Sequence, residues 1–76
     1  MKPYIKAVSI LSAKPYKMEI LFSNGQSKNV DFKKIISPDN FLANQVLNKN
    51  YFMCATVSKF GAIEWPNGYD ISPLSL

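Results

Sequence analysis

The chain has no histidine and no arginine, and its 76 residues include a single cysteine, Cys54. Without histidine, the chain lacks the side chain that most often acts as a general acid or base near neutral pH. One thiol can neither close a disulfide within the chain nor form a metal site by itself. We therefore expect a reduced, non-enzymatic protein with no catalytic residues, no metal site and no cofactor.

Long hydrophobic runs are also missing from the chain. No apolar stretch reaches the length of a membrane span, and Met1-Lys2-Pro3 does not open a signal peptide, so we expect a cytoplasmic protein. The length allows one domain, residues 1–76. Hydrophobic residues make up 47% of the chain, and aromatic residues make up 13%. Both contents are too high for a disordered chain.

All nine positive charges are lysines, and with five acidic residues they give a net charge of +4. Residues 1–34 hold seven lysines against two acidic residues, whereas residues 60–76 hold two acidic residues and no lysine. This distribution suggests either an anion-binding face or a solvated surface that keeps a small domain soluble. We favour the solvated surface, because arginine, the usual bidentate ligand of guanine and phosphate, is absent.

The apolar patterns predict an α+β fold with one small antiparallel sheet of four to five strands, a meander plus a hairpin. One short helix is expected to pack on one face of this sheet. The expected strands are residues 4–11, 16–22, 26–32, 51–59 and 62–65. Cys54 is expected inside the fourth of these strands as a small core residue.

Ser37 is the predicted N-cap of the helix, with Pro38 at the first helical position. The helix is expected to end near Leu47, with Lys49 at its C-terminal end. The residues expected to face the core are Phe41, Leu42, Val46 and Leu47.

A hairpin turn is predicted at Ser23-Asn24-Gly25, after the alternating strand 16–22. A two-residue loop at Asn24 and Gly25 would pair Met18 with a polar residue, Asp31. A three-residue loop pairs Met18 with Val30 and gives the sheet one apolar face. We therefore predict the three-residue loop, with a type I turn and Gly25 in the left-handed conformation as a G1 bulge.

A second group of turn signals lies in residues 61–73. Trp65-Pro66-Asn67-Gly68 has the composition of a type I turn, and Asp70-Ile71-Ser72-Pro73 is expected to form a further turn. The segment is either a lid, with Trp65 closing one end of the core, or a recognition loop. We favour the lid. The interaction surface that a recognition loop would offer consists of Trp65, Asn67, Tyr69 and Asp70.

Several of these residues resemble a known bacterial family, the one catalogued as domain of unknown function 2442. The resemblance rests on Phe22-Ser-Asn-Gly25, Val30-Asp31, Tyr51-Phe52 and Gly61-x-Ile63-x-Trp65-Pro66-Asn67-Gly68-x-Asp70-Ile71-x-Pro73. It implies a small α+β domain and supplies no mechanism. Members of that family are often encoded beside another short protein, an arrangement similar to toxin–antitoxin pairs.

These observations favour a protein-interaction module of a bacterial cytoplasm. We expect it to bind a protein partner, such as a neighbouring toxin-like protein toward which it would be antitoxin-like, or a second copy of itself. We expect no membrane and no small-molecule ligand. The alternative is a weak nucleic-acid-binding or regulatory domain that uses its lysines.

Overall fold

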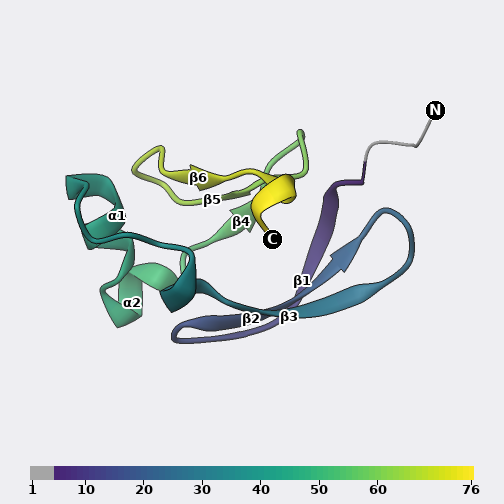
Figure 1. Ribbon diagram of the computed structural model, residues 1–76, viewed down its shortest axis with the longest axis horizontal. Helices are drawn as coiled ribbons and strands as arrows, with labels where there is room; N and C mark the ends of the chain where they lie inside the picture. Colours follow the sequence, from purple (N-terminus) through teal and green to yellow (C-terminus); the bar gives the residue numbers. More distant parts are fainter. Residues whose placement is uncertain (1–4) are drawn as a thin grey trace.

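The computed structural model describes residues 5–76, which form an α+β fold with two three-stranded antiparallel sheets and two short α-helices (Figure 1). The first sheet has the order β1-β2-β3 and contains β1 (Ala7–Lys14), β2 (Lys17–Phe22) and β3 (Ser27–Asp31). The second has the order β4-β5-β6 and contains β4 (Thr56–Val57), β5 (Ile63–Glu64) and β6 (Asp70–Ile71). The α+β class is confirmed, but two sheets replace the expected single sheet.

The helical elements are short and lie between and after the two sheets. They are the 3-10 helix η1 (Phe32–Lys34), α1 (Phe41–Val46), α2 (Lys49–Phe52) and the 3-10 helix η2 (Pro73–Ser75). None of the helices in residues 5–76 is long and apolar enough to cross a membrane.

The β2–β3 hairpin has the predicted register and loop. Met18 pairs with Val30, and the side chains of Met18, Ile20 and Phe22 are buried on one face. The Phe22 N–H donates to the Gln26 carbonyl oxygen at 2.8 Å. The Gly25 N–H donates back to the Phe22 carbonyl oxygen at 2.9 Å, and Gly25 has φ +85°. The three-residue loop with a left-handed glycine is confirmed.

The same loop closes two further hairpins, β4–β5 and β5–β6. In each hairpin, the carbonyl oxygen of the residue before the loop accepts from the N–H of the loop glycine. The N–H of that same residue donates to the carbonyl oxygen of the residue after the loop. The loops are 23–25, 59–61 and 66–68, ending in Gly25, Gly61 and Gly68. The expected turn at Trp65-Pro66-Asn67-Gly68 is therefore confirmed, with the Gly68 N–H 3.0 Å from the Trp65 carbonyl oxygen.

Strand β1 extends three residues beyond the end of the expected strand 4–11, whose first residue lies outside the described residues, and two irregularities interrupt its alternation. Its register with β2 shifts once between Ala7 and Ser9 and again between Ile10 and Ser12. Each shift adds one unpaired residue, Val8 or Leu11, as in a β-bulge. The inward side chains consequently recur every third residue, at 7, 10 and 13, whereas in a regular strand they recur every second residue.

The helix α1 begins at Phe41, not at Pro38, and its N-cap is Asn40, not Ser37. The Asn40 Oδ1 accepts from the N–H groups of Leu42 (2.7 Å) and Ala43 (3.4 Å). The Ser37 hydroxyl instead donates to the Asp39 carboxylate at 2.9 Å. Because the helix starts later than expected, the residues that face the core differ from the predicted ones. Phe41 is 82% exposed, and the buried residues of α1 are Ala43 and Val46.

A second helix occupies the first part of the expected strand 51–59. The Asn48 Oδ1 accepts from the N–H groups of Asn50 (3.0 Å) and Tyr51 (3.2 Å), and this cap starts α2 at Lys49. Lys49 therefore begins a helix rather than ending one. Only β4 remains of the expected strand, and Cys54 is exposed after α2 instead of buried.

The segment expected to turn at Asp70-Ile71-Ser72-Pro73 is extended at its start. Ile71 pairs with Ile63, so that Asp70 and Ile71 form β6. The Ser72 hydroxyl accepts from the Leu74 N–H at 3.2 Å and caps η2.

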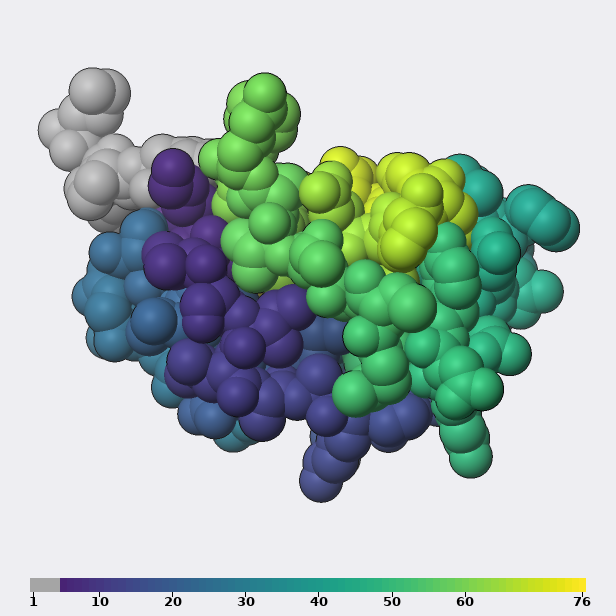
Figure 2. Space-filling model, turned by 180° about the vertical axis from the view of Figure 1, so that it is seen from behind, coloured from purple at the N-terminus to yellow at the C-terminus, as the bar shows by residue number. Residues whose placement is uncertain are grey.

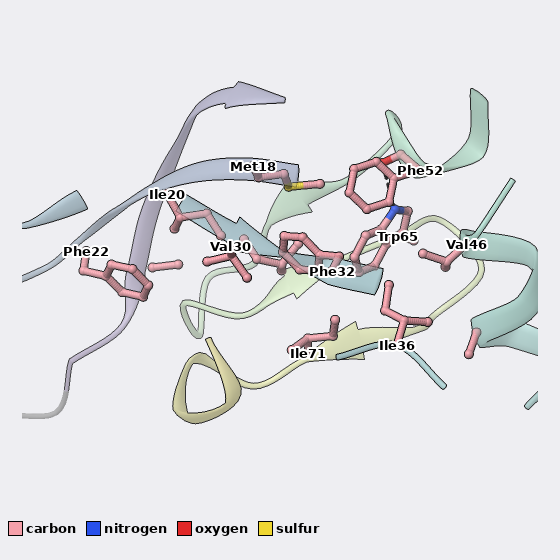
Figure 3. Close-up of a cluster of buried hydrophobic side chains, with 13 residues drawn as sticks. Met18, Ile20, Phe22, Val30, Phe32, Ile36, Val46, Phe52, Trp65 and Ile71 are labelled. Atoms are coloured by element: carbon pink, nitrogen blue, oxygen red, sulfur yellow. Dashed lines mark hydrogen bonds between the residues drawn. The ribbon is translucent and has the colours of Figure 1, made fainter. Parts of the chain in front are cut away.

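The core joins both sheets and both α-helices around a group of aromatic rings (Figure 3). Phe32 packs edge-on to Phe52, with ring centroids 5.6 Å apart, and Trp65 lies 6.1 Å from Phe32 and 5.9 Å from Phe52. These three rings come from η1, α2 and the start of the β5–β6 loop. Residues distant in the sequence therefore share one core.

Candidate functional site

Trp65 belongs to the core and not to an exposed surface. Its side chain is only 3% exposed, and its Nε1 donates to the Phe52 carbonyl oxygen at 3.0 Å. A buried indole with its N–H satisfied has no atom left for a partner in this conformation. The geometry supports the lid interpretation, and the expectation of Trp65 as an exposed contact residue is wrong.

Asn67 fixes the tip of the β5–β6 hairpin to α1. Its Nδ2 donates to the Leu42 carbonyl oxygen (3.2 Å) and to Gln45 Oε1 (3.0 Å). Its Oδ1 accepts from the Tyr69 N–H at 2.9 Å, which stabilises the turn itself. Both the amide nitrogen and the amide oxygen of Asn67 are thus bonded within the fold, and Asn67 holds the β5–β6 hairpin against α1.

Tyr69 and Asp70, like Asn67, reach the surface at least in part. The Tyr69 ring is half-buried beside Trp65, with centroids 5.8 Å apart, and Asp70 is exposed on β6. Burial, and secondarily the negative charge of Asp70, raises the pKa of the Tyr69 phenol above its usual value of 10.0. The four candidate residues are therefore neighbours, but they do not form one accessible surface.

A different surface, on the outer side of β1, presents apolar side chains to solvent. Val8 and Leu11 are 52% and 51% exposed, and each is the extra residue of a bulge. Ser9 pairs with Leu21, whose side chain is half-buried and alternates with the inward Ile20 and Phe22. We call Val8, Leu11 and Leu21 the bulge patch. Figure 2 shows the surface of β1 in purple, open to solvent.

A shallow hollow lies toward the other end of the same sheet, beyond the bulge patch. The hollow has a volume of about 590 Å³, and its polar lining includes Ser12, Lys14, Lys17, Asn29 and Lys34. Two carboxylates also line it, but both accept hydrogen bonds within the fold. Glu19 accepts from the Ser27 hydroxyl, and Asp31 accepts from the Lys33 N–H. We call this feature the basic hollow.

Sequence reasoning missed the bulge patch and the basic hollow. The signal for the patch was the three-residue spacing of Ala7, Ile10 and Ala13, which a strand with period two cannot bury on one face. The signal for the hollow was Lys14-Pro15-Tyr16-Lys17, a short turn with a lysine on each side.

The model of the family described as "Protein of unknown function (DUF2442)" matches residues 6–76. The chain belongs to this family. The resemblance seen in the sequence is thereby confirmed at the level of the family. No curated protein and no solved structure matches the chain.

In this DUF2442 chain, the exposed aromatic rings belong to elements other than the strands of the bulge patch. Phe41 is on α1, and Phe60, which is also exposed, is in the β4–β5 loop with the Lys59 ammonium group 5.2 Å from its ring centroid. Among residues 5–76, no three histidine, cysteine or acidic side chains are grouped closely enough to hold a metal ion. An aliphatic patch and a basic hollow on one sheet face are two features that the described chain offers for recognition.

Proposed function

We propose that this DUF2442 chain is a non-enzymatic protein-interaction module whose contact surface is the bulge patch. The observation that carries this proposal is the exposure of Val8 and Leu11, about half of each side chain, at consecutive bulges of β1. Single exposed aliphatic residues are ordinary on protein surfaces. Two that recur at matching irregularities beside Leu21 form a surface that a partner can cover.

The bulges also favour one mode of binding over another. A flat edge strand invites addition of a partner strand through backbone hydrogen bonds, whereas bulges interrupt that ladder. A partner of β1 is therefore expected to contact side chains rather than extend the sheet. Such recognition depends on the residue types at positions 8 and 11, which makes the proposal testable by substitution.

The partner that we propose is the protein encoded next to this one in a bacterial genome, with this chain as its antitoxin-like binder in the cytoplasm. The similarity of the family's gene arrangement to toxin–antitoxin pairs supports this choice. A second copy of the chain is the competing protein partner. The two differ in the mass of the complex.

Co-expression with the neighbouring protein tests the proposal. The tagged chain is expected to co-purify with the neighbour, and the Val8→Ser/Leu11→Ser double variant is expected to lose it. Leu74→Ser is the control, because Leu74 is also apolar and is even more exposed, but lies on η2. Absence of co-purification, together with a strictly monomeric mass by light scattering, would refute the proposal.

The basic hollow keeps nucleic-acid binding as a second candidate function. Three lysines line it, and contacts of lysine with phosphate weaken steeply as salt concentration rises. A fluorescent oligonucleotide titrated at low salt tests this candidate. An unchanged fluorescence anisotropy under those conditions would eliminate it.

A further inference from the structure

We infer that the bulge patch and the basic hollow together bind an acidic segment of the protein partner. The apolar side chains of the segment would cover Val8 and Leu11, and its carboxylates would enter the basic hollow. This inference rests on the proposed function and adds the chemistry of the partner to it.

The arrangement of lysines in the basic hollow is the first argument. Lys14 and Lys17 are direct cross-strand partners at the β1–β2 turn. Like charges at opposed positions of an antiparallel pair repel each other and destabilise the sheet. Lys34 of η1 lines the same hollow and adds a third positive charge. Asp31, opposite Lys17 on β3, offsets part of this repulsion, and an incoming carboxylate would relieve the remainder.

The state of the neighbouring carboxylates is the second argument. The Asp31 Oδ1 lies 3.1 Å from the Lys33 N–H and caps η1, and Glu19 Oε2 lies 3.3 Å from the Ser27 hydroxyl. These bonds give both carboxylates a role inside the fold. Both carboxylates keep their negative charge, but the three ammonium groups of the hollow outnumber them and leave a positive excess.

The distance between the patch and the hollow sets the length of the segment. Val8 and Lys14 lie six residues apart on β1, roughly 20 Å at the rise of an extended strand. About six extended residues of a partner span this distance. The segment should therefore be apolar at one end and acidic at the other.

The charges also argue against other occupants of this face. A second copy of the chain that used the same face would bring its own lysines toward Lys14, Lys17 and Lys34, or toward the apolar bulge patch. Nucleic acid would gain phosphate contacts at the hollow but no stacking at Val8 and Leu11, which are aliphatic. An acidic protein segment is the occupant that complements both ends of the face.

A peptide titration followed by amide NMR shifts tests the inference. The probe is a short blocked peptide whose first half alternates leucine with serine and whose second half alternates glutamate with serine. Its counterpart carries lysine in place of every glutamate, and oligo(dT) is the nucleic-acid probe. We expect the acidic peptide to shift the amide signals of residues 8–17 and Lys34, with an affinity that falls as salt rises.

Lys14→Glu is the decisive variant, because it would form a cross-strand ion pair with Lys17 instead of a repulsive one. The variant should fold at least as stably as the parent chain, yet bind the acidic peptide about tenfold more weakly. Lys59→Glu is the matched control, since it changes the net charge equally on the β4–β5 loop. Its affinity for the peptide should stay within about twofold of the parent's.

Each contrary outcome has a separate meaning. No shift with the acidic peptide, an equal response to the lysine counterpart, or full binding by Lys14→Glu would overturn the inference. Tighter binding of oligo(dT) at the same amide groups would overturn it in favour of nucleic acid. In the first three cases the proposed function would still stand if the neighbouring protein co-purifies with the parent chain.

Discussion

At the scale of single residues, Gly61 and Gly25 occupy the same position in two hairpin loops but have different surroundings. Both have positive φ, +80° and +85°. A Cβ at Gly25 would meet no atom within 4 Å, whereas a Cβ at Gly61 would lie 2.2 Å from Lys6 Cβ and 3.1 Å from the Ala7 nitrogen. Gly25 is therefore required by backbone conformation alone, and Gly61 by conformation and space together.

We predict that Gly61→Ala destabilises the protein more than Gly25→Ala. The left-handed conformation should cost each variant about 1–2 kcal/mol. The clash with Lys6 and β1 should cost Gly61→Ala roughly a further 1–3 kcal/mol, because the backbone must shift to relieve it. Urea unfolding of the two variants measures the difference. Equal losses of stability in the two variants would contradict the close packing of the β4–β5 loop against Lys6 and β1.

The phenol of Tyr69 provides a prediction about pH. Its pKa is raised in the folded protein by burial and then by Asp70, so the unfolded chain ionises first as the pH rises. The contribution of Tyr69 to stability is therefore complete below pH 10 and is lost as the pH rises through the folded pKa. Urea unfolding at several alkaline pH values should show a decline in stability that is shallower for Tyr69→Phe.

Tyr51→Phe is the control for the Tyr69 experiment, because Tyr51 lies on α2 and is also half-buried. Asp70→Asn should leave the burial of Tyr69 in place and remove only the smaller electrostatic cause. Its decline with pH should lie between those of the parent chain and Tyr69→Phe. A decline of the same steepness in Tyr69→Phe and the parent would contradict the assignment.

At the scale of elements, the start of α1 gives a direct comparison of two capping residues. The Asn40 side chain accepts two backbone N–H groups of α1, whereas the Ser37 hydroxyl bonds to Asp39 outside the helix. We predict that Asn40→Ala lowers the free energy of unfolding by about 1 kcal/mol, as loss of an N-cap does. Ser37→Ala should change it by less than about 0.5 kcal/mol. Thermal melts followed by circular dichroism measure both, and a larger loss in Ser37→Ala would restore Ser37 as the cap.

The elements differ in how well the sequence predicts them. The β2–β3 hairpin was predictable because its alternation is regular and only one loop length gives it an apolar face. The inward face of strand β1 was not predicted, because two bulges change the spacing of its inward residues from two to three. Bulges of this kind depend on the packing of neighbouring elements, which the local pattern does not reveal.

The helices were misread for a related reason. Ser37-Pro38-Asp39 has the composition of a helix start, but Asn40 and Asn48 provide the caps of two very short helices. Helices of this length are not stable alone and depend on tertiary contacts, so local propensity does not decide between the candidates. The exposed surface was also not predictable from local sequence, because the burial of Trp65 and the exposure of Val8 and Leu11 follow from the packing of the whole fold.

At the scale of the whole molecule, the two sheets do not have separate cores. Met18, Ile20 and Val30 of the first sheet belong to the same buried cluster as Ile63 and Ile71 of the second (Figure 3). A chain of this length buries too little surface for either sheet to be stable without the other. The protein should therefore unfold in a single cooperative transition.

Two probes of different parts of the fold test this cooperativity. Trp65, the single tryptophan, reports by fluorescence on the place where the second sheet meets Phe32 and Phe52, and far-ultraviolet circular dichroism reports mainly on the longer first sheet. We predict coincident urea transitions for both signals. Phe32→Leu should move both midpoints together, because Phe32 contacts the aromatic group while directly following β3, at a cost of about 1–3 kcal/mol. A fluorescence transition that precedes the dichroism transition would instead mean that the β1–β3 sheet, with the bulge patch on its outer face, persists without the rest of the core.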